Sequence, residues 1–107
     1  MKLIMAIVSN DDTNFVIKAL YKEKFQATKL ATTGGFLSKG NTTLIVGCED
    51  EDVNRVIDII GSESKKRTEI VPSTASYEGA EIISTPIQIT VGGATIFVLN
   101  VEQFVKL

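Results

Sequence analysis

Hydrophobic and polar positions recur with two different spacings in the first quarter of the chain. Residues 3–8 form a near-continuous apolar run, which predicts a buried strand. Asp11 and Asp12 then offer an N-cap and favourable charge for the first turn of a helix. Apolar residues at helical spacing predict that this helix covers residues 12–24 and buries one stripe: Phe15, Val16, Ala19 and Leu20.

Two further strands and a second helix follow from the same periodicities. Residues 26–33, rich in threonine, and residues 42–48 are predicted strands. Asp50 or Asp52 is the expected N-cap of the second helix, and Gly61 is expected to end it at the C′ position. The apolar stripe of this helix consists of Val53, Val56, Ile57 and Ile60.

The segment after the second helix, residues 62–85, is rich in serine and threonine. Structureless loops beyond about 12 to 15 residues are uncommon and tend to be functional or disordered. We expect residues 69–71 to pair with residues 82–83 as a short hairpin, and the tip at residues 72–79 to be mobile.

Residues 87–99 are the predicted last strand, with Gly92 and Gly93 inside it. Paired glycines in a strand indicate a bulge or a close approach by another backbone or a ligand.

The element order β-α-β-β-α-β predicts an α+β fold, a ferredoxin-like sandwich with an antiparallel sheet and two helices on one face. In the first strand, Leu3, Met5 and Ile7 point to one face, and the equally apolar residues between them point to the other. Because two helices cover only one face, we expect self-association to bury the second.

Composition narrows the class of function. The chain has 107 residues, 44% of them hydrophobic and 22% charged, which predicts one globular domain over residues 1–107. The net charge of -2 argues against a nucleic-acid partner, because phosphate neutralisation needs a dense basic patch. The basic run Lys65, Lys66 and Arg67 is interpreted as a solvated loop, with a phosphate contact as the alternative.

The residue inventory also argues against catalysis. Cys48 is the single cysteine, so no intramolecular disulfide can form, and its apolar neighbours predict a small buried side chain. The chain has no histidine, which removes the commonest general base and metal ligand. We therefore expect no enzyme, no metal site and no cofactor. No apolar run approaches the roughly 18 residues of a membrane span, so we expect a cytoplasmic protein.

The turn ATTGGFLSKGN at residues 31–41 is longer than a hairpin requires. Gly34 and Gly35 allow positive φ and close approach of another group. Phe36 and Leu37 gain nothing from the core of this chain, and Asn41 has the donor and acceptor that can read an adenine edge. The turn predicts a nucleotide cradle. The alternative is a turn shaped by glycine, with the apolar pair against a neighbouring subunit and Asn41 bonded to its own backbone.

Two longer stretches resemble the cyclic di-AMP receptor family, the PII-like proteins also called DarA or PstA. They are ATKLATTGGFLSKGNTTLIVG at residues 27–47 and VGGATIFVLNVEQF at residues 91–104. The resemblance implies a homotrimer of ferredoxin-like subunits that binds cyclic di-AMP, a bacterial second messenger, in the clefts between subunits. It also implies a short T-loop at residues 34–40 and a long B-loop at residues 62–85. Rearrangement of the B-loop would pass the signal to an unidentified downstream protein.

The resemblance assigns ligand contacts by position to Thr28, Gly35, Phe36, Leu37, Asn41, Gly47, Gly92 and Phe97. Asn41 would read an adenine, Thr28 would bond polar groups, and Phe97 would line the pocket. Gly35 and Gly92 would allow close backbone approach.

Two positions depart from the family pattern. Gln26 stands where relatives have an arginine, and Lys106 stands where they have a glutamine. A charge-assisted hydrogen bond lost at Gln26 would be worth about 1.5–3 kcal/mol. Gln26 remains in the predicted site, and two alternatives stay open. One is a PII-like regulator of another adenine nucleotide such as ATP, and the other is a structural trimer that has lost ligand binding.

Overall fold

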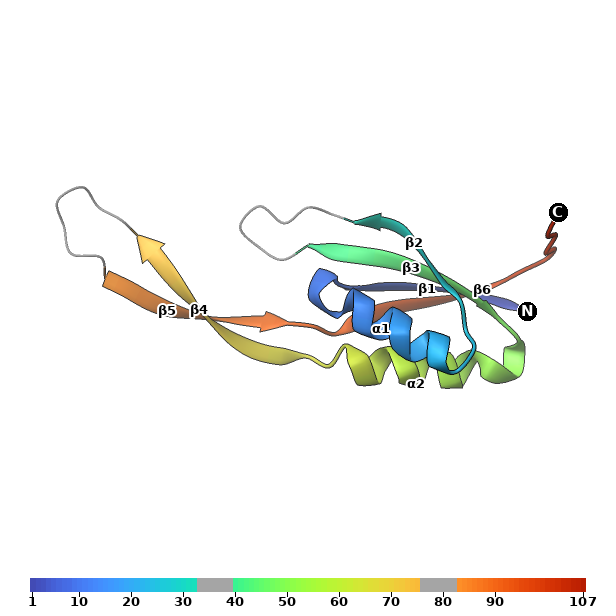
Figure 1. Ribbon diagram of the computed structural model, residues 1–107, viewed down its shortest axis with the longest axis horizontal. Helices are drawn as coiled ribbons and strands as arrows, with labels where there is room; N and C mark the ends of the chain where they lie inside the picture. Colours follow the sequence, from blue (N-terminus) through green and yellow to red (C-terminus); the bar gives the residue numbers. More distant parts are fainter. Residues whose placement is uncertain (33–39, 76–82) are drawn as a thin grey trace.

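The computed structural model describes residues 1–32, 40–75 and 83–107 and arranges them as strands and two helices (Figure 1). In chain order these are β1 (Lys2–Ser9), α1 (Asn10–Lys22), β2 (Ala27–Thr32), β3 (Asn41–Cys48), a 3-10 turn (Asp50–Asp52), α2 (Val53–Glu63), β4 (Arg67–Ala75), β5 (Ile83–Val91) and β6 (Ala94–Asn100).

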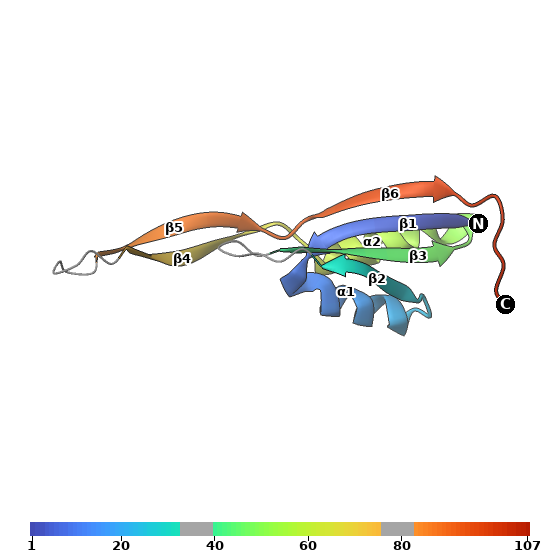
Figure 2. The same cartoon turned by 90° about the horizontal axis from the view of Figure 1, so that it is seen from above.

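Four strands form one antiparallel sheet in the order β2-β3-β1-β6. The helices α1 and α2 pack side by side against it (Figure 1). The predicted β-α-β-β-α-β order and the antiparallel sheet with two helices are confirmed. The structure adds a second sheet, a ribbon of β4 and β5 that projects from one end of the main sheet, while both chain termini lie at the other end (Figure 2).

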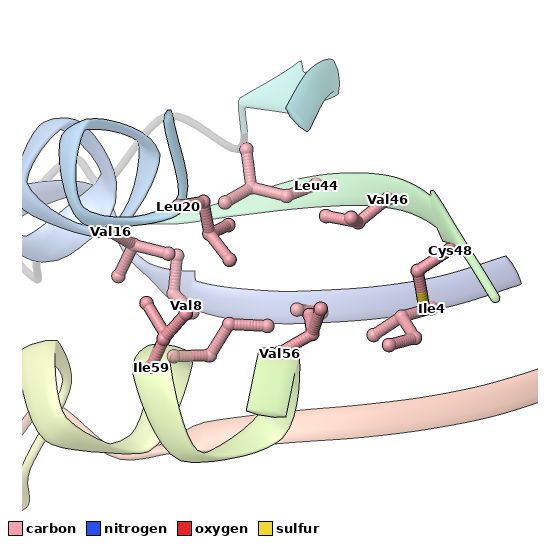
Figure 3. Close-up of a cluster of buried hydrophobic side chains, with 11 residues drawn as sticks. Ile4, Val8, Val16, Leu20, Leu44, Val46, Cys48, Val56 and Ile59 are labelled. Carbon is pink, nitrogen blue, oxygen red and sulfur yellow. The ribbon is translucent and has the colours of Figure 1, made fainter. Parts of the chain in front are cut away.

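The core lies between the main sheet and the helices. Every second residue of β1 and β3 points into it, as the pleat of a strand requires, and the helices contribute side chains three or four positions apart. Figure 3 shows this packing. The buried members are Ile4, Ala6, Val8, Val16, Leu20, Leu44, Val46, Cys48, Val56, Ile59 and Ile60.

The start of α1 differs from the sequence prediction. Ser9 is the N-cap, and its Oγ accepts a hydrogen bond of 3.4 Å from the Asp11 backbone N–H. Asp12 is buried and pairs with a distant arginine instead of capping. Phe15, predicted to be buried, is 62% exposed, because the buried stripe is centred on Val16 and Leu20.

The ends of α2 also differ from the prediction. A 3-10 turn precedes the helix, and Asp52 occupies the N-cap position without a side-chain capping bond. Gly61 does not end the helix, which continues to Glu63. Ser64 ends it instead: its backbone N–H donates to the Gly61 carbonyl at 3.4 Å and its buried hydroxyl donates to the Ile60 carbonyl at 2.5 Å.

The predicted strand over residues 87–99 is broken at its glycine pair. Gly92 and Gly93 have φ of 86° and 81°, in the left-handed region, and they separate β5 from β6. A Cβ on Gly92 would overlap the Lys65 carbonyl oxygen. The close approach that the glycines indicated is therefore made by the chain's own backbone, where β4 begins.

The hairpin after α2 is longer than predicted, and the expected pairing of residues 69–71 with residues 82–83 is wrong. Glu69 lies opposite Ile89 and Ala75 lies opposite Ile83, so nine residues of each strand pair. Residues 72–75 of the expected mobile tip are part of β4. The rest of that tip, residues 76–79, lies outside the described residues.

Candidate ligand-binding site

One face of the main sheet is covered by no helix of the described residues and still presents large side chains. Strand registry places Thr28 opposite Ile45, Ile45 opposite Met5, and Met5 opposite Phe97. Residues in cross-strand register project from the same face of a sheet, so these four form one row across all four strands. We call the side of the sheet that bears this row the uncovered face. Phe97 lies on the edge strand β6 and is 52% exposed.

A second row on the uncovered face runs from Gly47 through Leu3 to Leu99. Gly47 leaves bare backbone there, because a Cβ built on it would meet no described atom within 4 Å. The conformation and packing of this subunit do not require glycine at position 47. The absent side chain therefore leaves room for a second molecule against β3.

Asn41 begins β3 and points to the same face as Ile45 and Gly47, two and three pleats further along. It is exposed and lies beside a pocket of about 220 Å³. Residues of β1, β3, β6, the β5–β6 corner and the segment before β4 line this pocket: Ile7, Asn41, Lys66, Gly92, Gly93, Ala94 and Thr95. Two of the predicted contact residues, Asn41 and Gly92, are thus brought together.

Hydrogen bonds fix the strand start that carries Asn41. The backbone N–H of Asn10 donates to the Gly40 carbonyl at 2.9 Å. The Thr42 hydroxyl donates to the Asn10 side-chain oxygen at 2.5 Å, and Thr42 is buried. The first turn of α1 therefore holds the residues on both sides of Asn41, which leaves the position of its backbone well determined.

The remaining predicted contacts are dispersed. Thr28 lies in the row of Ile45, about 14 Å along the strand from Asn41 at 3.4 Å per residue. Gln26 is exposed and lines a different pocket with Tyr21 and Lys24. Gly35, Phe36 and Leu37 lie outside the described residues. The Asn41 pocket and the Gln26 pocket thus hold different members of the predicted set.

A groove between α1 and α2 is the feature that sequence reasoning missed. It has a volume of about 510 Å³, and its wall includes Phe15, which was expected in the core. Arg55 on α2 pairs across it with Glu23 at 2.5 Å, and other charges of both signs surround it. A buried stripe of α1 displaced by one position from the predicted stripe leaves Phe15 exposed. The local sequence does not indicate this displacement.

Arg67 has the most consequential electrostatic environment in the described chain. Its Nη2 lies 2.9 Å from Asp12 Oδ1 and its Nη1 3.3 Å from Asp12 Oδ2, a forked pair with a buried carboxylate. This hydrogen bonding raises the pKa of the Arg67 guanidinium, despite the opposing effect of desolvation. The interpretation of residues 65–67 as a solvated loop is therefore wrong for Arg67, which is structural and begins β4.

Two other groups have displaced pKa values. Burial, reinforced by the negative charge of Asp52 and Glu49, raises the pKa of the Cys48 thiol. The buried position predicted for Cys48 is confirmed. A hydrogen bond from the N-terminal ammonium lowers the pKa of the Asp50 carboxyl, with 3.1 Å between the two groups. Across the described residues, no cluster of three histidine, cysteine or acidic side chains could hold a metal ion.

These features define a class of protein: a mixed α+β domain consistent with a ferredoxin-like fold, with an uncovered sheet face and a pocket beside it. None of its described helices is long and apolar enough to cross a membrane. The family model described as "Cyclic-di-AMP receptor" matches residues 1–107. The chain belongs to the cyclic-di-AMP receptor family, whose members are receptors of this messenger.

A solved structure supports the fold. The crystal structure of "a functionally unknown protein from Pediococcus pentosaceus ATCC 25745" is similar to this chain with a TM-score of 0.74 and 41% sequence identity. The match covers 99% of this chain and 96% of that chain. Because the likeness spans nearly all of both chains, the projecting β4–β5 hairpin lies within the matched length.

Proposed function

We propose that this protein is a cytoplasmic receptor that binds cyclic di-AMP in the clefts between the subunits of a homotrimer. Membership of the cyclic-di-AMP receptor family supports the ligand. The observation that carries the rest is the placement of Thr28, Asn41, Gly47 and Phe97 on the uncovered face, which the two described helices do not cover.

The cleft between subunits follows from where these residues lie. Thr28 is on the edge strand β2 and Phe97 on the opposite edge strand β6, about 14 Å apart over three strand spacings. In our proposal Phe97 of the partner subunit approaches the Thr28 edge and completes the site. The same contact buries Met5, Leu3 and Ile7, which are half-buried in the isolated subunit.

Each side chain has a role that its chemistry permits. Asn41 reads an adenine edge through its amide, and Phe97 stacks on a base. Thr28 donates to or accepts from a polar group of the ligand. Gly47 lets a base or sugar approach the backbone of β3, where a side chain would stand in the way. The family resemblance implies that Phe36 and Leu37, in the T-loop at residues 34–40, would contact the ligand and that Gly35 would allow close backbone approach; all three lie outside the described residues.

Gly92 is assigned a narrower role than backbone contact with the ligand. Its positive φ and its proximity to the Lys65 carbonyl give it a structural reason to be glycine. It lines the Asn41 pocket by shaping the β5–β6 corner. Its effect on the ligand is then exerted through the position of that corner.

The signal passes, in this proposal, from the T-loop to the β4–β5 hairpin, whose described strands include residues 67–75 and 83–85 of the B-loop at residues 62–85. The first turn of α1 contacts both. Asn10 holds the strand start next to the T-loop through Gly40 and Thr42, and Asp12 holds Arg67 at the base of β4. A ligand that repositions the T-loop therefore changes contacts of the same helical turn that anchors the hairpin, whose altered surface an unidentified protein would read.

Gln26 favours an alternative that the same experiment addresses. It offers no fixed charge where relatives have an arginine, and it lies apart from the Asn41 pocket. The site would then accept a different adenine nucleotide such as ATP, because Asn41 reads the base and not the phosphates. The second alternative is a structural trimer that has lost ligand binding altogether.

Isothermal titration calorimetry with cyclic di-AMP tests the proposal, with ATP titrated in parallel at two temperatures. We expect saturable binding of about one cyclic di-AMP per subunit, and Asn41→Ala should weaken it by about tenfold or more. Circular dichroism of Asn41→Ala checks that the variant is folded. If neither temperature gives heat at high micromolar cyclic di-AMP, the receptor proposal is wrong, and a signal with ATP alone would favour the alternative.

A further inference from the structure

Lys66 lies across the corner that shapes the Asn41 pocket. A Cβ built on Gly93 would stand 3.1 Å from Lys66 Cγ and 3.2 Å from Lys66 Cε, so the lysine stem occupies the space above the bare glycine. The Gly93 backbone N–H donates to the Ser64 carbonyl and fixes the corner against the chain that leads into Lys66. Lys66 and Asn41 both line the pocket beside this corner.

The charge of Lys66 is not used by the fold. Arg67 is paired with Asp12 and lies 3.7 Å from Glu69, and the ion pairs of the described residues do not include Lys66. The stem packs over Gly93 while the side chain as a whole is exposed, which is how lysines commonly present an ammonium group to water. An ammonium held beside an adenine-reading amide suits an anionic group attached to the same ligand.

The pocket itself holds part of a ligand. Its volume of about 220 Å³ is below the roughly 300–1,000 Å³ of sites that enclose a drug-sized molecule. It therefore accommodates one portion of a dinucleotide, with the remainder on the uncovered face or against a second subunit. A lysine binds phosphate as a point charge and needs no forked geometry.

We propose that Lys66 binds a phosphodiester group of the nucleotide whose adenine contacts Asn41, supplying the positive charge that Gln26 does not. The inference rests on the proposed receptor function and adds a phosphate-recognising residue to it. It makes this site selective for adenine nucleotides that carry a phosphodiester over the nucleoside alone.

Calorimetry on three variants tests this inference. Lys66→Gln removes the charge, Lys66→Arg keeps it, and Lys65→Gln removes the charge of the neighbouring lysine, which does not line the pocket. Each is titrated with cyclic di-AMP at low and at physiological salt, and with adenosine, which has no phosphate. Thermal unfolding confirms that each variant is folded.

We expect Lys66→Gln to weaken the binding of cyclic di-AMP about two- to fivefold, the range for a solvent-screened charge contact. Its affinity should also depend less on salt, while Lys66→Arg and Lys65→Gln stay within about twofold of the parent protein. Adenosine binding should be the same in all four proteins.

Two results would overturn the inference and leave the receptor function standing. One is equal weakening by Lys66→Gln and Lys65→Gln, which would mean a general effect of surface charge. The other is a parallel loss of adenosine binding, which would place Lys66 on the base. If the parent protein binds no cyclic di-AMP, the proposed function and this inference both fail.

Discussion

The Arg67 guanidinium reaches across from the base of β4 to the buried Asp12 carboxylate at the start of α1, with 2.9 Å between Nη2 and Oδ1. The Asp12 side chain is 5% exposed and that of Arg67 39% exposed. The carboxylate therefore depends on this partner, while the guanidinium still reaches water. The pair joins the helical layer to the projecting hairpin.

Removing the guanidinium should be costly for stability. Arg67→Met leaves the Asp12 carboxylate buried without its partner, and we expect a loss of about 2–3 kcal/mol in the free energy of unfolding, at the low end for a buried pair because Arg67 is partly solvated. Urea denaturation followed by circular dichroism measures it. The matched control is Arg55→Met, which breaks an exposed pair with Glu23 and should cost less than about 1 kcal/mol. Equal losses in the two variants would contradict the structural role of Asp12.

The sequence predicted the main sheet because its signals are local. The apolar run that became β1 and the helical spacing that became α1 and α2 each depend on neighbours within a few residues. Asp12 shows where this reasoning ends. An acidic residue at a helix start is ordinarily a cap or a favourable first-turn charge, and its true partner is 55 residues away. No local pattern encodes that contact.

Two glycines should respond in opposite ways to an added side chain. At Gly47 a Cβ meets no described atom of its own subunit, and a β-branched residue suits a strand, so Gly47→Val should not destabilise the fold of the subunit. The same variant should weaken cyclic di-AMP by about tenfold or more, because its side chain occupies the place proposed for the ligand. Calorimetry and thermal unfolding of one preparation measure both.

Gly92→Ala is the counterpart. Its Cβ would overlap the Lys65 carbonyl, at a φ that L-residues rarely adopt, so we expect a loss of about 1–3 kcal/mol in stability. A variant Gly47→Val that unfolds as readily as Gly92→Ala would show that β3 is covered in the folded protein by something other than ligand.

The uncovered face should control assembly. Leu99 is 44% exposed and shares its row with Leu3 and Gly47. Leu99→Asp places a charge in the surface that we propose is buried between subunits, so it should convert a trimer into chains of 11.6 kDa. Light scattering coupled to size-exclusion chromatography gives the mass directly. A parent protein already at 11.6 kDa at high concentration would refute the proposed assembly.

The candidate site was only partly predictable for a related reason. The residues of β1 are apolar on both faces of the strand, which indicated that one face needs a partner. In the structure the residues of β1 on the uncovered face are half-buried. Strand registry, which sets Thr28 in line with Phe97, is a relation between residues far apart in the chain. Lys66 was assigned to a solvated loop because its neighbours suggest one, and its place at the Asn41 pocket follows from the turn at Gly92 and Gly93.

Cys48 gives a prediction about pH. Because burial raises the pKa of its thiol in the folded protein, the folded state holds that proton more tightly than the unfolded chain does. Its contribution to stability is complete below the pKa of the unfolded thiol and is lost as pH rises through the folded pKa. Cys48→Ala should therefore show a smaller loss of stability than the parent protein from pH 8 upward, measured by urea denaturation. A thiol reagent should also react at least about tenfold more slowly with the folded protein than with the unfolded chain.

The link between ligand and hairpin can be tested separately from binding. If the T-loop and the β4–β5 hairpin communicate through the first turn of α1, saturating cyclic di-AMP should change the rate of limited proteolysis within residues 72–79. We expect a change of about threefold or more, because cleavage follows the population of accessible conformations.

Arg67→Met removes the contact between that turn and β4, so it should abolish this effect of the ligand on proteolysis. It should leave most of the affinity for cyclic di-AMP, which calorimetry checks in the same samples. Arg55→Met, which removes the α2 pair with Glu23, should respond as the parent protein does. A ligand effect of the same size in Arg67→Met would show that the hairpin senses the ligand by a route other than Asp12, and an unchanged rate in the parent protein would remove loop rearrangement from the mechanism while leaving ligand binding intact.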